Sequence, residues 1–99
     1  MDLEKYTQHV PGEDRGKVLL FAISTCGWCQ KTKGLLRNLG IDFKYIDVDL
    51  LDGVARDEVM KEVSRWNERR SFPTLVVNDR SIVGFQEEKT REELGSGSR

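Results

Sequence analysis

Two cysteines separated by two residues are the groups in this sequence whose type and spacing can do chemistry. They are the cysteines of a 99-residue chain and lie in the segment Ser24-Thr25-Cys26-Gly27-Trp28-Cys29. A structural disulfide at this spacing would close a very small loop and would restrict the unfolded chain little. The pair therefore indicates reversible thiol–disulfide exchange rather than a covalent staple.

The pair is expected where a buried strand gives way to a helix. Residues 17–23 form a continuous apolar run between Gly16 and Ser24, which is typical of a strand buried on both faces. From Cys26 onward apolar residues recur every three or four positions, which predicts an amphipathic helix that stops at Gly40. The predicted apolar stripe contains Trp28, Thr32, Leu35, Leu36 and Leu39, with Lys31, Lys33 and Arg37 elsewhere.

A cysteine in the first turn of such a helix has a distinctive electrostatic environment. Unpaired backbone N–H groups and the positive end of the helix dipole favour thiolate over thiol. In pairs of this kind the pKa of the leading thiol falls to roughly 3.5–7.5 from about 8.5. We therefore predict that Cys26 is the nucleophile and that Cys29, one turn further on and more buried, is the resolving thiol. Lys31 and Lys33 either add positive charge nearby or belong to a solvated helix face.

The remaining elements predict a small α/β domain over residues 17–94. A strand is expected around residues 43–46, a helix at about 53–67, a hairpin from 74–77 and 81–83, and a last helix at about 86–94. Residues 1–16 form an N-terminal extension, in which Tyr6, Gln8 and Val10 weakly indicate an edge strand. Residues 95–99 are a Gly/Ser tail with the composition of a flexible linker or a cloning scar.

Charge and hydropathy restrict the partners. The chain has 16 Lys and Arg against 17 Asp and Glu, so its net charge of −1 does not attract nucleic acid or anionic membranes. The start lacks the apolar run of a signal peptide, and the longest apolar stretch is too short to span a bilayer. We therefore expect a cytoplasmic monomer with no nucleic-acid and no membrane partner.

Two plainer explanations of the cysteines stay open. A structural zinc site usually has four ligands, and one Cys-x-x-Cys pair with the single His9 supplies too few, so no metal is expected. Both cysteines could instead simply pack in the core. The glycine between them and their place at a strand–helix junction are not what packing alone would select.

A second candidate element is Ser71-Phe72-Pro73-Thr74, just before the predicted hairpin. Proline lacks a backbone N–H and suits the start of a strand, in either the cis or the trans form. If this loop lies beside Cys26, the backbone of Thr74 can hold an extended substrate by strand-like pairing.

Residues 17–94 resemble the glutaredoxin branch of the thioredoxin superfamily. The resemblance rests on Cys26-Gly27-Trp28-Cys29 after a strand, Phe72-Pro73-Thr74 before a hairpin, and Val83-Gly84-Phe85 before the last helix. It implies a thioredoxin-like fold with a four-stranded mixed sheet flanked by three helices, Pro73 in the cis form and packed against the cysteines, and an active site at the carboxyl end of the central strand. It also implies a protein disulfide reductase whose substrates contact Thr25, Gly27, Trp28, Phe72, Pro73, Thr74, Gly84 and Phe85.

Within that family the sequence resembles archaeal and anaerobe glutaredoxin-like proteins, on the combination of Arg65-Trp66-Asn67, Ser71-Phe72-Pro73-Thr74 and Gly84-Phe85. Thioredoxins have a buried acid where this chain has Leu20, and glutathione-dependent glutaredoxins have a Gly-Gly pair and an Asp where it has Gly84-Phe85. The resemblance therefore implies glutathione, another small thiol or a reductase protein as the reductant, and glutathione is expected to be slow. Trp66 is expected to be a core or rim aromatic.

The resemblance also implies an alternative function. Some glutaredoxins without proline after the first cysteine bridge a [2Fe–2S] cluster between two subunits and act as cluster carriers. Gly27 leaves this alternative open.

Overall fold

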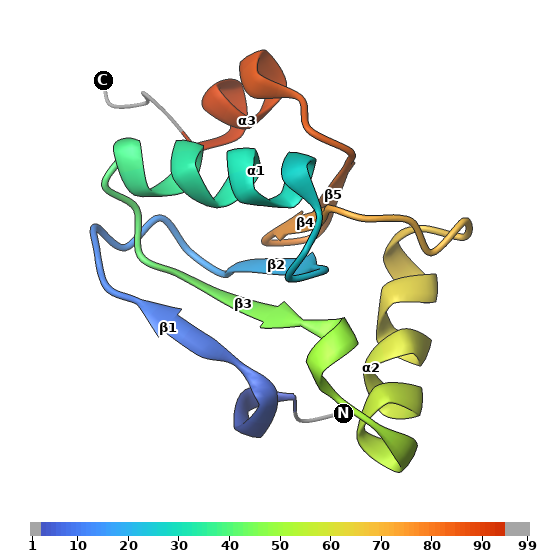
Figure 1. Ribbon diagram of the computed structural model, residues 1–99. Helices are drawn as coiled ribbons and strands as arrows, with labels where there is room; N and C mark the ends of the chain where they lie inside the picture. The colour runs from blue at the N-terminus through green and yellow to red at the C-terminus, as the bar shows by residue number, and fades with distance from the viewer. Residues whose placement is uncertain (1–2, 95–99) are drawn as a thin grey trace.

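The architecture is a mixed five-stranded sheet with helices on both faces, seen in a computed structural model that describes residues 3–94 (Figure 1). The sheet order is β1-β3-β2-β4-β5, so β2 is central as predicted. The strands are β1 (Gln8–Val10), β2 (Val18–Ala22), β3 (Phe43–Asp47), β4 (Thr74–Val77) and β5 (Arg80–Val83). The helices are α1 (Gly27–Asn38), α2 (Gly53–Trp66) and α3 (Glu87–Leu94), with short 3-10 helices η1 (Glu4–Tyr6) and η2 (Val48–Leu50).

The thioredoxin-like α/β fold is confirmed, but the expected count of four strands is wrong by one. The fifth strand, β1, comes from the N-terminal extension and pairs antiparallel with β3, in the register His9 opposite Lys44. The His9 Nε2 lies 2.7 Å from Asp42 Oδ1, and the backbone of Glu13 bonds to Gly40 and Asp42. This short, mostly polar strand is stabilised by partners more than thirty residues away in the sequence. The alternation of its own residues is therefore only a weak signal for a strand.

Strand direction decides which loops meet. The two inner strands β2 and β3 are parallel, whereas β4 is antiparallel to both β2 and β5. The end of β2, the end of β3 and the start of β4 therefore share one edge of the sheet. The segment that contains Cys26 leaves from this edge.

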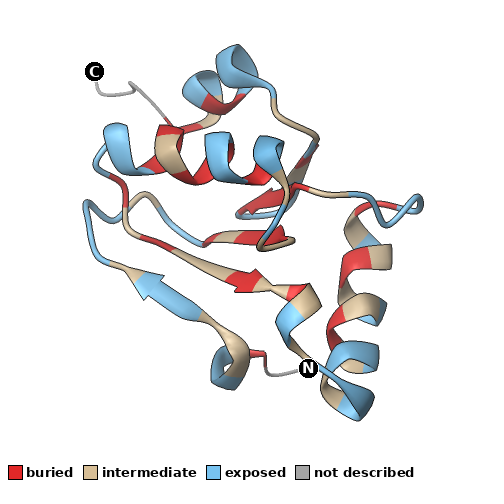
Figure 2. Cartoon of the chain, viewed as in Figure 1, coloured by how far each residue is buried: buried red, intermediate tan, exposed pale blue. Residues whose placement is uncertain are grey.

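Alternating side chains of the sheet build two cores. Leu20 and Ala22 of β2 pack under α1 and α3, in a cluster with Leu36 and Leu94. Phe21 points to the other face and packs with α2. Figure 2 shows the buried side of each helix turned toward the sheet. A continuous apolar strand is explained by this arrangement, because both of its faces are covered.

The predicted end of the first helix is confirmed in detail. The Gly40 N–H donates to the Arg37 carbonyl at 2.9 Å and the Ile41 N–H donates to the Leu36 carbonyl at 3.3 Å, which together form a Schellman motif. Gly40 has φ +70°, a conformation that glycine adopts without strain.

Of the helices in residues 3–94, none is long and apolar enough to cross a membrane.

The central strand yields a stability prediction. Leu20 is 0% exposed in the core beneath α1, whereas Leu50 is 70% exposed on η2. We expect Leu20→Ala to lower the free energy of unfolding by about 2–5 kcal/mol, because it removes buried methyl groups and leaves a cavity. The matched change Leu50→Ala is expected to alter it by less than about 0.5 kcal/mol. Denaturant unfolding of both variants tests this, and equal losses would contradict the assignment of the core.

Candidate active site

Cys26 caps the helix that carries both cysteines. It is the N-cap residue of α1, with extended backbone, and its Sγ accepts a hydrogen bond from the Cys29 backbone N–H at 3.2 Å. Its carbonyl accepts the Gln30 N–H at 3.0 Å. A sulfur thus takes the position that a serine or aspartate oxygen usually fills. The predicted strand-to-helix junction is confirmed.

The two thiols have different environments. Cys26 is partly exposed, whereas Cys29 is 0% exposed, and neither forms a disulfide in this structure. The hydrogen bond from the Cys29 thiol is the main cause that lowers the pKa of Cys26; burial opposes it, and the backbone N–H groups of Cys29 and Trp28 lower the pKa further. Burial, followed by the hydrogen bond to Cys26, raises the pKa of Cys29 to about 12. The geometry therefore gives one exposed, acidic thiol and one buried thiol that holds its proton.

The loop before Cys26 is held by an acid that the sequence analysis did not select. The backbone N–H and the hydroxyl of Ser24 donate to Asp49 at 2.8 and 2.6 Å. These bonds lower the pKa of Asp49. The Gln30 side chain donates to the Ser24 carbonyl at 3.0 Å from the other side. Asp49 follows strand β3, and the shared edge of parallel strands is the signal that would have found it.

The proline loop lies at the same edge of the sheet. The Phe72–Pro73 peptide bond is cis, the form that the resemblance implied. Thr74 pairs with Phe21 on one side and Val83 on the other, so the loop starts beside the end of β2. The Pro73 carbonyl accepts the Gly84 N–H at 2.8 Å. This bond joins two segments of the predicted site.

A buried asparagine fixes the conformation of that loop. The Asn67 side-chain amide donates to the Ser71 carbonyl at 3.2 Å, to the Ser71 hydroxyl at 3.0 Å and to the Thr74 hydroxyl at 3.0 Å. The Thr74 hydroxyl in turn donates to the Ser71 carbonyl at 2.8 Å. Asn67 is thus a positioning residue for the proline loop. The sequence analysis gave Asn67 only as part of the motif Arg65-Trp66-Asn67, and its hydrogen bonds depend on how the loop after α2 folds back toward it.

Trp28 does not cover the core, which corrects the predicted apolar stripe of α1. Its side chain is 58% exposed and stacks on Phe85, with ring centroids 5.8 Å apart and an interplanar angle of 25°. The ammonium of Lys31 lies 5.2 Å from the Trp28 ring. Thr25 and Gly27, on either side of Cys26, are exposed as well. The aromatic pair therefore forms a surface next to the exposed thiol.

Lys33 is buried, so a solvated face is the wrong description of it. It is 5% exposed, and its ammonium bonds both carboxylate oxygens of Asp47, at 2.9 and 3.2 Å. The ammonium also lies 4.3 Å from the centre of the Tyr45 ring.

Trp66 lies where the sequence analysis expected it: it is partly buried against the core beneath α2, and its indole N–H donates to Glu62 at 3.0 Å.

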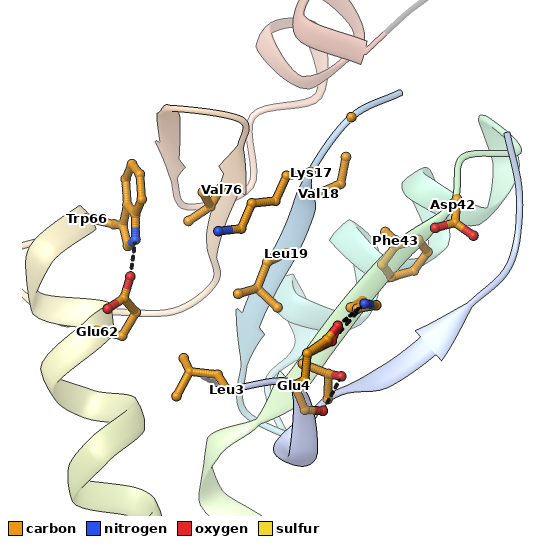
Figure 3. Close-up of a pocket in the computed structure, with 13 residues that line it drawn as sticks. Leu3, Glu4, Lys17, Val18, Leu19, Asp42, Phe43, Glu62, Trp66 and Val76 are labelled. Atoms are coloured by element: carbon orange, nitrogen blue, oxygen red, sulfur yellow. Dashed lines mark hydrogen bonds and ion pairs between the residues drawn. The ribbon is translucent and has the colours of Figure 1, made fainter. Parts of the chain in front are cut away.

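A pocket among the described residues lies away from the cysteines. It has a volume of about 330 Å³ and lies over the opposite ends of β2 and β3, between η1 and α2. Lys17, Leu19, Phe43 and Trp66 line it (Figure 3). Neither Cys26 nor Cys29 is among its lining residues. Among residues 3–94, no group of three or more His, Cys, Asp or Glu side chains is placed to hold a metal ion.

Comparison with known proteins agrees with this geometry. The glutaredoxin family model matches residues 18–82, which is more than half of the chain. The chain belongs to the glutaredoxin family. This glutaredoxin is 50% identical to methanoredoxin of Methanosarcina acetivorans, with a TM-score of 0.82 over 85% of this chain and 90% of the other.

Two further relatives place it among archaeal and anaerobe glutaredoxins. It is 50% identical to the glutaredoxin of Methanosarcina mazei Go1, with a TM-score of 0.85 over 91% of this chain and 88% of the other. It is 32% identical to an uncharacterized glutaredoxin-like 8.6 kDa protein of Clostridium pasteurianum, over 69% of this chain and 84% of that protein. The glutaredoxin identity that the motifs implied is confirmed.

The thiol environments predict how the acidity of Cys26 depends on Cys29. The thiol of Cys29 donates to Cys26, and a serine hydroxyl can replace that donor whereas alanine cannot. We expect the pKa of Cys26 to be higher in Cys29→Ala than in Cys29→Ser. The midpoint of the pH dependence of Cys26 alkylation then moves to higher pH in the alanine variant. Identical midpoints would show that the backbone N–H groups alone set the acidity.

Proposed function

We propose that this protein is a dithiol oxidoreductase that reduces disulfides in other proteins through Cys26 and Cys29. The carrying observation is the asymmetric pair: an exposed sulfur at the N-cap of α1 that accepts from the Cys29 backbone N–H at 3.2 Å, beside a fully buried thiol. We place the protein in the cytoplasm as a monomer, where reducing conditions return the pair to the dithiol form.

The proposed reaction has two exchange steps. The Cys26 thiolate attacks a substrate disulfide, which releases one substrate thiolate and leaves Cys26 in a mixed disulfide. Cys29 then loses its proton and attacks the Cys26 sulfur, which forms the Cys26–Cys29 bond and releases the second substrate thiol. An external dithiol or two small thiols restore the starting state. Each step exchanges one S–S bond for another, so the electrons balance.

The surface around Cys26 supports a protein substrate. Trp28 and Phe85 present a stacked aromatic pair, and the proline loop precedes β4, which pairs with β2, the strand that leads to Cys26. The backbone of Thr74 already lies between two strands. We therefore assign strand-like pairing with an extended substrate to Phe72, the partly exposed residue just outside that ladder.

We further propose that the reductant is a small thiol other than glutathione, or a reductase protein. Phe85 occupies the segment where glutathione-dependent relatives have small residues. Acidic side chains of α3 would repel the carboxylates of glutathione, but two of them are paired: Glu87, at its start, with Arg91 at 3.0 Å, and Glu93, near its end, with Arg80 at 3.3 Å. A related fold, 26% identical with a TM-score of 0.63, is that of the Escherichia coli glutaredoxin-like NrdH-redoxin, whose activity profile is described as thioredoxin-like.

Trapping tests the order of the two thiols. Cys29→Ser is expected to accumulate a mixed disulfide with a protein substrate, because the intermediate lacks its resolving thiol. Cys26→Ser is expected to abolish turnover of protein disulfides. Non-reducing electrophoresis and a disulfide-reduction assay measure both results.

Two outcomes would contradict the proposal. Substantial reductase activity in Cys26→Ser would remove Cys26 from the nucleophilic role. Visible absorbance of an iron–sulfur cluster after anaerobic purification, together with no reductase activity, would favour the cluster carrier instead.

A donor panel tests the reductant. We expect oxidised protein to be reduced slowly by glutathione and faster by another small thiol or a thioredoxin reductase. With the faster donor, Phe85→Ala is expected to raise KM about two- to tenfold, because an aromatic pair contributes about 0.5–1.5 kcal/mol beyond its buried area. Val54→Ala, on the exposed face of α2, is the matched control. Rapid glutathione turnover that Phe85→Ala leaves unchanged would refute the assignment.

A further inference from the structure

Cys29 faces a charge that the two exchange steps do not otherwise use. Lys33 lies four residues after Cys29 in α1, so the two side chains share one face of the helix. Its ammonium is buried and bonds both oxygens of Asp47 on β3, 2.9 and 3.2 Å away. Tyr45 covers it from the same strand, with the ring centre 4.3 Å away. A buried lysine held by a carboxylate and an aromatic ring is a fixed charge, not a mobile surface cation.

The environment of Cys29 changes during the reaction. In the reduced protein the Cys26 sulfur raises the pKa of Cys29 both as a hydrogen-bond partner and as a charge. In the mixed disulfide Cys26 is uncharged, so both of these effects are lost. Burial still opposes ionisation, whereas the Ile23 N–H, 3.5 Å from the Cys29 sulfur, and the charge of Lys33 favour it.

We propose that Lys33, held in place by Asp47, is a positioning residue that stabilises the Cys29 thiolate in the resolving step. The inference rests on the proposed dithiol function. In that step the Cys29 thiol gives its proton to solvent, its sulfur bonds to Cys26, the bond from Cys26 to the substrate sulfur breaks, and the departing thiolate takes up a proton. No oxidant or reductant beyond the mixed disulfide is involved.

Other titratable groups near Cys29 are few within residues 3–94. Cys26 faces it from the helix cap, and Lys33 faces it from the next turn of α1. Asp47 and Tyr45 of β3 contact Lys33, and the charge of Lys33 also lowers the pKa of Asp49 beyond the end of β3. Lys33 is therefore the cation near the buried thiol, and Asp47 is the carboxylate in contact with it.

Opposite changes to the ion pair test the proposal. In a Cys26→Ser background, Lys33→Met is expected to raise the pKa of Cys29, because the stabilising charge is lost. Asp47→Asn is expected to lower it, because the ammonium is then no longer offset. A purely structural ion pair predicts shifts in the same direction, since both changes break the same contact. Ultraviolet thiolate absorbance against pH measures the shifts, with Lys61→Met on the exposed face of α2 as the charge-matched control.

Resolution kinetics give a second readout. In the protein with both cysteines, a preformed mixed disulfide on Cys26 is expected to resolve on the order of tenfold more slowly at neutral pH in Lys33→Met. The deficit is expected to shrink at high pH, where Cys29 is ionised in either protein. Lys33→Arg retains the charge and is expected to restore most of the rate.

The outcomes distinguish failure of the proposed role of Lys33 from failure of the dithiol function on which that role rests. Failure of wild-type Cys29 to resolve the mixed disulfide would overturn the dithiol function. Normal wild-type resolution together with an unchanged Cys29 pKa in Lys33→Met, or with shifts of the same sign in both variants, would overturn the role of Lys33. If Lys33→Met does not fold, the double variant Lys33→Met/Asp47→Asn buries no unpaired charge. Its Cys29 pKa is expected above the wild-type value, and a value at or below wild type would overturn the proposal.

Discussion

The cap of α1 by a sulfur atom is the contact on which the site depends. The Cys29 N–H donates to the Cys26 Sγ at 3.2 Å, so the group that ends the helix is also the group that reacts. The cap holds Cys26 at the surface, and the first turn of α1 places Cys29, three residues further on, in the core. The same backbone geometry thus creates both the acidic thiol and the protected one, and a shift of the helix start by one residue would remove the distinction.

Sheet topology supplies everything that surrounds this cap. Parallel pairing of β2 and β3 brings Asp47 and Asp49 to the end of β2, where they hold Lys33 and Ser24. Antiparallel pairing of β4 with β2 brings Pro73 to the same edge. The residues come from three parts of the chain, but each lies next to a strand end, so the register of the sheet sets their separation.

Lys31 and Lys33 of α1 show that the local sequence does not predict whether a charged side chain is buried or exposed. Lys31 and Lys33 differ by two positions, which on a helix is a rotation toward the opposite face. Lys31 is exposed above the Trp28 ring, whereas Lys33 is buried against Asp47. A buried ion pair costs desolvation and is weak evidence for stability. Its place beside Cys29 is better explained by its effect on that thiol.

Much of the molecule could be predicted from the chain itself. The apolar run of residues 17–23, the helical period after Cys26 and the stop at Gly40 are local patterns, and local backbone preferences enforce them. The Cys-x-x-Cys spacing at a helix start likewise implies unequal thiols, because the helix dipole and free N–H groups act within one turn. These features need no distant partner, and the structure has them where the patterns indicate.

Other features were decided by contacts between distant segments. The edge strand β1, the exposed stack of Trp28 on Phe85 and the burial of Lys33 each depend on a partner that only the folded sheet brings near. Hydrophobic periodicity predicts which face of a helix is buried, but not whether a neighbouring loop offers an aromatic ring or a carboxylate. Such partners determine whether an amphipathic side chain is buried or exposed, because a tryptophan or a lysine can be stable either at the surface or in the core.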